Sequence, residues 1–322
     1  MRAIRFSRTG GPEVLDSVEV ETPKPGPGQI LIRHAAIGLN FIDTYHRSGL
    51  YPVKLPCTPG GEAAGEVEAV GEGVTRFKTG DTVAYVGGFG AYAEFNVVAE
   101  NRAVAVPASL GPVAGAAALL KGMTVEFLLR RCYSVKPGET ILVHAAAGGV
   151  GQIMVQWAKA LGAKVIATVG SEDKAARARQ LGADHCILYR QQDVAVEVKR
   201  ITSGQGVPVA YDSVGKDTFE GTLGSLARRG LFVSFGNASG PPAPVPPGRL
   251  AQAGSLYLTR PTLFDYIATP QELDASAAAL WEVMGSGQVR VQVGQTFPLA
   301  DARLAHEALE ARATIGASLL IP

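Results

Sequence analysis

The segment 138–171 constrains the fold more than any other part of the chain. It opens with a short apolar run, 141–145, whose length and branched residues are typical of a buried strand. A turn of small residues, 146–151, follows, and 153–161 then places apolar side chains at helical spacing. A second run rich in β-branched residues occupies 164–169. The order of strand, glycine turn, helix and strand predicts a βαβ unit within a parallel sheet.

The glycine turn of this unit predicts a dinucleotide site, because such turns hold a pyrophosphate on the helix N-terminus. The turn departs from the pattern G-x-G-x-x-G, since Ala146 occupies the first glycine position. The strand before it and the helix after it, which the motif requires, are both expected here. The alternative is an ordinary tight turn whose glycines serve close packing.

Residues after the second strand favour NADP over NAD. An NAD site usually has an acidic residue about twenty positions after the glycines, where it binds the ribose hydroxyls. Here Gly170 and Ser171 stand at that place, with Lys174 close behind. A hydroxyl and a lysine can bind a 2′-phosphate through charge-assisted hydrogen bonds, whereas a carboxylate would repel it. Alternatively, Ser171 caps the next helix and Lys174 is solvated, and both roles can hold together.

Length and composition limit the class of protein. A chain of 322 residues exceeds the usual single domain, so two domains are expected. The formal net charge of +1 gives no electrostatic case for nucleic acid or an anionic membrane. The cysteines Cys57, Cys132 and Cys186 lie far apart, which favours a reducing compartment over a disulfide framework. Without a signal-peptide core or an apolar run long enough to span a bilayer, the protein is expected to be cytoplasmic.

The first part of the chain, up to about residue 120, is expected to be β-rich and irregular. Strands with apolar and polar alternation are expected at 29–37, 65–70 and 81–85, and a bend at 86–94 leads into another. After the first of these strands, 38–51 gathers hydrogen-bonding side chains beside Tyr45 and Tyr51, on a loop and a short helix.

From about residue 121 to 259 the signals alternate between helix and strand. Beyond the opening βαβ unit, helices are expected at 171–181, 194–201 and 219–226, and strands at 186–188, 207–212, 230–236 and 255–259. These six strands with helical crossovers predict a doubly wound parallel sheet. Ligands of such sheets bind beyond the carboxyl ends of the strands.

The C-terminal part is too short to form a domain of its own. Helices are expected at 270–284 and 300–310, and strands at 293–297 and 317–321. We expect this part to return to the first domain, which makes the dinucleotide domain an insertion.

The sequence offers no metal site, because Cys, His and carboxylates do not cluster at ligand spacing. The histidines are scattered, at His34, His46, His144, His185 and His306. We interpret His144, in the first buried strand, as a hydrogen-bonded core residue. Neither a Ser-His-Asp signature nor a P-loop lysine is present, so nicotinamide hydride transfer without a metal is the chemistry expected.

Motifs along the whole chain resemble the zinc-free, zeta-crystallin-like quinone oxidoreductases of the medium-chain dehydrogenase/reductase superfamily. They lie at 10–15, 40–45, 47–51, 121–124, 144–151, 211–215, 233–237 and 312–314. Zinc-binding relatives carry a cysteine where this chain has Asn40, and Gly-His-Glu where it has Gly-Gly-Glu at 60–62. The four-cysteine structural lobe is also missing. Both departures agree with the lack of a metal site.

The resemblance implies an α/β fold of two domains: a GroES-like, β-rich substrate domain at 1–121 and 262–322, and a Rossmann NADPH-binding domain at 122–261. It places Gly148, Gly149, Val150 and Gly151 at the pyrophosphate, and Ser171, Lys174 and Tyr189 around the 2′-phosphate and adenine. It places Asn40, Thr124, Phe235, Asn237, Ser239 and Arg312 at the nicotinamide half of the cofactor. The residues that face the quinone would be Asn40, Asp43, Tyr45 and Tyr51.

The activity that the resemblance implies is NADPH-dependent quinone reduction, with Asn40, Tyr45 and Thr124 as catalytic residues. Tyr45, Asn40 or a water would donate to the developing quinolate, as preorganised donors do for oxyanions. Transfer of one electron at a time stays open, and no residue is an obvious general acid. Two alternatives are an NADPH-dependent reductase of activated alkenes and a non-enzymatic NADPH-binding protein that touches RNA. The resemblance also implies a homodimer, for which the strand 255–259 is the expected edge.

Overall fold

The computed structural model describes residues 1–322, which divide into two compact units. The first unit contains Met1–Met123, Ile267–Ser286 and Val291–Pro322, and the second contains Thr124–Tyr266 and Gly287–Arg290. The chain thus leaves the first unit after Met123, returns to it at Ile267, and leaves it once more for the four residues Gly287–Arg290. The assignment of a substrate domain and an NADPH-binding domain stays a prediction.

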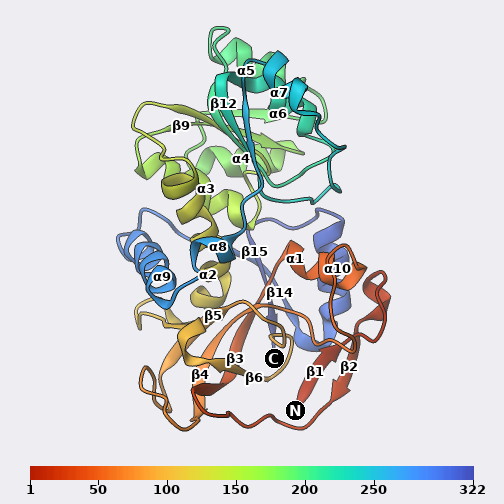
Figure 1. Ribbon diagram of the computed structural model, residues 1–322, viewed down its shortest axis with the longest axis vertical. Coiled ribbons are helices and arrows are strands. Elements are labelled where there is room, and N and C mark those ends of the chain that lie inside the picture. The colour runs from red at the N-terminus through yellow and green to blue at the C-terminus, as the bar shows by residue number, and fades with distance from the viewer. The chain divides into compact units, whose positions relative to one another are not determined.

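The second unit is built on a six-stranded sheet in the order β10-β9-β8-β11-β12-β13, seen in Figure 1 through its labelled strands β9 and β12. The strands are β8 (Thr140–Val143), β9 (Lys164–Val169), β10 (His185–Leu188), β11 (Val207–Asp212), β12 (Leu226–Ser234) and β13 (Tyr257–Thr259). All neighbouring strands run parallel. The predicted doubly wound parallel sheet is therefore confirmed.

Helices connect these strands, namely α3 (Gly149–Ala160), α4 (Glu172–Gln180), α5 (Val194–Ile201) and α6 (Phe219–Ser225), with α7 (Pro247–Gln252) and α8 (Leu263–Tyr266) after them. Helices α5 and α6 cover one face of the sheet, where Val198 and Leu223 share a buried cluster with Leu142 and Phe232. Helices α3 and α4 both contact β9. The helices bury the central strands, which explains their nearly continuous apolar sequences.

The first unit contains a seven-stranded sheet in the order β14-β15-β3-β4-β5-β7, with β6 also paired to β3. Its strands are β3 (Gln29–Leu39), β4 (Glu62–Val70), β5 (Thr82–Val86), β6 (Phe95–Ala99), β7 (Ala103–Ala105), β14 (Val293–Pro298) and β15 (Ala317–Ile321). Only β14 and β15 pair in parallel. Strands β1 (Arg2–Arg5) and β2 (Asp16–Glu19) form a separate antiparallel pair.

Three helices lie wholly within the first unit: α1 (Phe41–Ser48), α9 (Pro270–Gly285) and α10 (Ala302–Glu310). Short 3₁₀ turns lie at Pro12–Val14, Glu100–Arg102 and Leu299–Asp301. Helix α10 buries Ala305 and Leu309 in the same apolar cluster as Ile32 and Leu39 of β3. This packing joins the C-terminal segment to the N-terminal strands.

The longest helix, α2 (Gly111–Phe127), was not predicted from the sequence; it continues as a π-helical turn at Leu128–Cys132. Most of its residues are apolar, so no 3.6-residue periodicity marks it. Contrary to our expectation, the 22 residues Gly111–Cys132 are long and apolar enough to cross a membrane. However, 78% of the apolar window is buried inside the protein, as in the core helix of a globular protein.

Candidate active site

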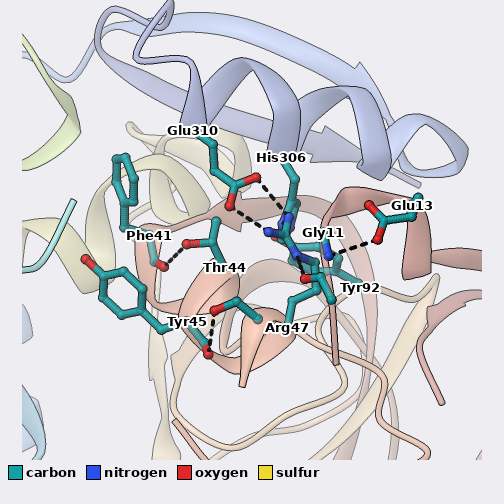
Figure 2. A network of polar contacts seen from close by, with 11 residues as sticks. Gly11, Glu13, Phe41, Thr44, Tyr45, Arg47, Tyr92, His306 and Glu310 are labelled. Carbon is teal, nitrogen blue, oxygen red and sulfur yellow. Dashed lines mark hydrogen bonds and ion pairs between the residues drawn. The ribbon is translucent and has the colours of Figure 1, made fainter. Parts of the chain in front are cut away.

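Helix α1 divides the predicted site residues between two faces. Asn40 caps the helix, and its backbone N–H donates to Asp43 Oδ2 at 2.9 Å, the return bond of a capping box. Asp43 and Arg47, one turn apart, are both buried. Phe41 and Tyr45 are also one turn apart, and Figure 2 shows their side chains directed away from Arg47.

An aromatic cluster surrounds Tyr45. The rings of Tyr45 and Tyr51 meet edge to face with centroids 5.4 Å apart, and Phe41 lies 6.4 Å from Tyr45. His46 extends the cluster to Phe89, whose ring centroid is 4.9 Å away. Burial lowers the pKa of His46, so its imidazole is neutral at pH 7. The structure therefore brings the two predicted quinone-facing tyrosines together in a surface suited to a flat aromatic ligand.

The side-chain amide of Asn40 has a fixed direction. Its Nδ2 donates to Glu62 Oε2 at 2.8 Å and to the Gly38 carbonyl at 3.3 Å. Both amide hydrogens are thereby engaged, so the group that Asn40 can offer to a ligand is its oxygen. Asn40 was one of the expected donors to the quinolate, whereas this geometry favours Asn40 as an acceptor.

A buried ion pair lies beneath Asn40. Glu62 is fully buried, and its Oε2 lies 2.9 Å from the ammonium Nζ of Lys121, which is 4% exposed. The Leu120 N–H donates to the other carboxylate oxygen at 2.7 Å. A Cβ on Gly38 would overlap with Glu62 Oε2, so glycine allows β3 to approach this carboxylate. This pair was not predicted from the sequence, where its signal is the ionisable residue Lys121 inside a long apolar segment.

These residues do not fit a zinc ion. No group of three or more His, Cys, Asp or Glu side chains in the chain could hold a metal. Asn40 and Gly61 stand where zinc relatives supply a cysteine and a histidine, and both oxygens of Glu62 already accept N–H groups. A glycine without a side chain and an amide nitrogen that donates hydrogen bonds supply no ligand for zinc.

Asp43 lies in the interior rather than at the surface. It is 1% exposed, and the hydroxyl of Tyr92 donates to its Oδ2 at 3.0 Å. Burial raises the pKa of Asp43 to about 7; the Asn40 N–H, Tyr92 and Lys121 lower it, and Glu62 raises it. A direct contact between Asp43 and a quinone stays a prediction, and this burial favours an indirect role.

The glycine turn fits a pyrophosphate. Gly148 is the N-cap of α3 and supplies no side-chain cap, which leaves the first N–H groups of the helix to other acceptors. A Cβ on Gly151 would overlap with the carbonyl oxygen of Ala145, so glycine is needed for helix and turn to approach. Gly149 and Val150 form the first turn of α3. The roles of these residues at NADPH stay predictions.

The carboxyl end of β9 gathers donors suited to a phosphate. Ser171 caps α4 and accepts the Lys174 N–H at 3.5 Å, so the alternative role as a cap is confirmed. A Cβ on Gly170 would lie 3.3 Å from Tyr189 Oη and 3.6 Å from Arg190 Nε. The structure thus brings Tyr189 to Gly170, and it adds the guanidinium of Arg190, which the sequence analysis missed. Arginine is a common ligand of the NADP 2′-phosphate.

The loop after β12 is ordered by its own hydrogen bonds. Ser239 Oγ donates to the Val214 carbonyl at 2.8 Å and accepts the Asp217 N–H at 3.0 Å. With its amide oriented to satisfy its neighbours, Asn237 accepts from Arg260 at 3.2 Å. The other residues predicted at the nicotinamide half are distributed between the units: Phe235 and Thr124 in the second, and Asn40 and Arg312 in the first. Their contacts with NADPH stay predictions.

His144 is a hydrogen-bonded core residue, as predicted. Its ring nitrogens lie 2.8 Å from Thr168 Oγ1 and 2.9 Å from Thr222 Oγ1. Thr222 also donates to Asp212 Oδ2 at 2.9 Å. Burial lowers the pKa of His144, so the ring is neutral at pH 7.

Comparisons with known proteins agree with this geometry. Residues 26–108 match the family described as alcohol dehydrogenase GroES-like domain, and residues 149–278 match the family described as zinc-binding dehydrogenase. A quinone oxidoreductase of Pseudomonas aeruginosa is 52% identical over 100% of this chain and 99% of its own. A 2-haloacrylate reductase of Burkholderia is 43% identical over 98% of this chain and 97% of its own.

Among solved structures, the Escherichia coli quinone oxidoreductase complexed with NADPH superimposes with a TM-score of 0.98. It is 50% identical, and the match covers 100% of both chains. The two family matches, the full-length identity and the unsuitability of the site for zinc agree with one another. The chain belongs to the quinone oxidoreductase family of the medium-chain dehydrogenase/reductase superfamily.

Proposed function

We propose that this protein is an NADPH-dependent quinone reductase that works without a metal ion. The observation that carries the proposal is the aromatic cluster of Tyr45 and Tyr51 next to a capping Asn40 whose side-chain amide donates to Glu62. The relatives named quinone oxidoreductase support the substrate class, and the relative solved with NADPH supports the cofactor.

In the reaction, bound NADPH supplies the hydride. The rings of Tyr45 and Tyr51 offer a flat surface for the quinone, and the Tyr45 hydroxyl donates to the quinone oxygen that gains negative charge. Asn40 accepts a hydrogen bond through its oxygen, because its two amide hydrogens are engaged. Water supplies protons to the hydroquinone oxygens.

Quinone turnover is expected to fall about a hundredfold when Tyr45→Phe is combined with Asn40→Ala, since loss of one preorganised donor commonly has an effect of this size. Steady-state kinetics with a benzoquinone measure it, and NADPH binding by the variant controls for folding. Turnover within about threefold of the wild type would show that these residues are wrongly placed in the reaction.

The selectivity for NADPH is expected to depend on Ser171. Ser171→Asp places a carboxylate where the 2′-phosphate is proposed to bind, so it should weaken NADPH binding by more than tenfold and NADH binding far less. Titrations of nicotinamide fluorescence measure both dissociation constants. Equal losses for the two cofactors would contradict the placement of the 2′-phosphate.

The alternative activity is the reduction of activated alkenes, and a relative named 2-haloacrylate reductase gives it a specific basis. Such a reaction would use the same cofactor and the same aromatic cluster. The quinone relatives are more similar to this chain, at 52% identity against 43%. We therefore retain quinone reduction as the proposed activity.

We further propose a cytoplasmic homodimer. Strand β13 lies at one edge of the parallel sheet, and Tyr257 on it is 62% exposed, so the edge can accept a second copy. The three free cysteines suit a reducing compartment. Tyr257→Lys should raise the monomer fraction in sedimentation experiments, and a wild-type protein that sediments as a monomer would contradict this assembly.

A further inference from the structure

Buried polar side chains form a continuous line of hydrogen bonds in the first unit, which we call the Arg47 chain; Figure 2 shows its members Arg47, His306 and Tyr92. Its members Asp43, Tyr92, His306 and Arg47 are each at most 2% exposed. Tyr92 Oη lies 3.0 Å from both Asp43 Oδ2 and His306 Nε2, and His306 Nδ1 lies 3.2 Å from Arg47 Nη1. The proposed reaction assigns no role to any of the four.

Arg47 sets the donor and acceptor direction of every hydrogen bond in the Arg47 chain. A guanidinium can only donate, so His306 Nδ1 is an acceptor. Burial and the charge of Arg47 lower the pKa of His306 to about 3, so the imidazole is neutral at pH 7. Its single hydrogen is therefore on Nε2 and is donated to Tyr92 Oη. The hydroxyl hydrogen of Tyr92 is then donated to Asp43.

Further hydrogen bonds hold both ends of the Arg47 chain. At one end, Arg47 is held by Glu310 through contacts of 2.6 and 3.1 Å, and its Nε donates to the Gly10 carbonyl at 3.1 Å. At the other end, Asp43 Oδ2 also accepts the backbone N–H of Asn40 at 2.9 Å. From Arg47 through His306 and Tyr92, each hydrogen bond of the Arg47 chain thus donates towards the Asp43 carboxylate, which is bonded to the N-cap of α1.

We propose that Arg47, His306 and Tyr92 are positioning residues that hold the Asp43 carboxylate as the acceptor for the Asn40 N–H and so orient Asn40 for the reaction. The proposal rests on the proposed role of Asn40. The other charged groups that act on Asp43 are Lys121 and Glu62. When Asp43 binds a proton, one of its acceptor positions is lost and its hydrogen bond with the Asn40 backbone N–H weakens.

A second buried tyrosine–histidine pair in the same unit provides a matched control. Tyr85 Oη lies 3.1 Å from His34 Nε2, and His34 Nδ1 lies 2.7 Å from the Ala93 carbonyl. Burial lowers the pKa of His34 to about 4, so its ring is neutral at pH 7. A carbonyl only accepts, so the hydrogen of His34 is on Nδ1 and Tyr85 donates to Nε2. This pair has the opposite direction, and its further partner Asn96 does not connect it to α1.

The first test is the tautomer of each histidine in the protein without cofactor. Nitrogen-15 NMR of the ring nitrogens should show the Nε2–H form for His306 and the Nδ1–H form for His34 at pH 7. An Nδ1–H tautomer or a charged ring at His306 would overturn the proposal, because the hydrogen bonds of the Arg47 chain would then not donate towards Asp43.

The second test follows the backbone amide resonance of Asn40 as a function of pH, with Tyr92→Phe and Tyr85→Phe as the matched pair. The resonance should titrate with a midpoint near the pKa of Asp43, about 7. Tyr92→Phe removes a donor to the carboxylate, so the midpoint should rise by half a pH unit or more. Tyr85→Phe should not move it. An equal midpoint in both variants would overturn the proposal.

The pH dependence of kcat tests whether the Arg47 chain acts on the reaction. The acid limb of the kcat profile for quinone reduction should move upward in Tyr92→Phe and stay in place in Tyr85→Phe, while NADPH binding is unchanged in both. A kcat profile that does not follow the Asn40 titration would overturn the positioning role. A protein that shows the NMR titrations but oxidises no NADPH with any quinone would instead overturn the proposed function.

Discussion

Replacing Lys121 with methionine is expected to lower the free energy of unfolding by about 3–5 kcal/mol, the usual cost of removing one partner of a buried ion pair. Glu62 is fully buried, and Lys121 Nζ lies 2.9 Å from its Oε2. Methionine has a similar length but no charge, so the variant leaves a carboxylate inside the protein without its cation. Urea unfolding near pH 7 measures the difference.

An exposed ion pair provides the control for this variant. Lys159 and Asp184 lie 2.9 Å apart, but their side chains are 34% and 31% exposed. Lys159→Met should therefore cost about 1 kcal/mol or less. If Lys121→Met lowers the free energy of unfolding by no more than Lys159→Met does, Lys121 does not neutralise a buried charge at Glu62. Adding Glu62→Gln to Lys121→Met should restore part of the stability, because the unpaired charge is then removed.

Replacing Asp43 with asparagine is expected to change how stability depends on pH. Burial raises the pKa of Asp43 from 3.8 to about 7, so between these values the folded protein binds a proton that the unfolded chain releases. The stability due to this proton is present below about pH 4 and is lost as the pH rises to about 7. The loss amounts to about 1.4 kcal/mol for each pH unit.

An asparagine side chain cannot titrate, so the Asp43→Asn variant should gain roughly 4 kcal/mol relative to the wild type between pH 4 and pH 7. Denaturant unfolding of both proteins at several pH values measures the gain. Asp184→Asn is a control whose stability relative to the wild type should change with pH in the opposite direction. Burial raises the pKa of Asp184, but the Val165 N–H and Lys159 lower it more, so that variant should lose stability relative to the wild type as pH rises. A constant difference between Asp43→Asn and the wild type would contradict the burial of an ionisable Asp43.

Local sequence patterns predicted most of the second unit correctly. Strands β9 and β11 and helix α5 of this unit have the same bounds in the sequence analysis and in the structure, as does β15 in the first unit. Each combines a clear apolar pattern with a turn signal at its end, so local information was sufficient. Helix α2 was missed because a helix buried on most of its surface has no polar face to reveal its period.

The polar interior of the site could not be predicted, because tertiary pairing creates it. Arg47 and His306 are 259 positions apart and meet only because β15 pairs with β3 and brings α10 to the same core. Likewise, the direction of the Asn40 amide depends on Glu62, 22 positions away. The resemblance to a known family identified Asn40 and Tyr45, but it gave no information on which atom of Asn40 is available.

The most direct test of the central claim is the rate of NADPH oxidation by the purified protein with benzoquinones and with cyclic enones as acceptors, and with NADH as the control cofactor. The account predicts turnover of NADPH with a benzoquinone, slower turnover with an enone, and much weaker activity with NADH. Binding of NADPH without its oxidation by any quinone, or faster turnover with enones than with quinones, would contradict it.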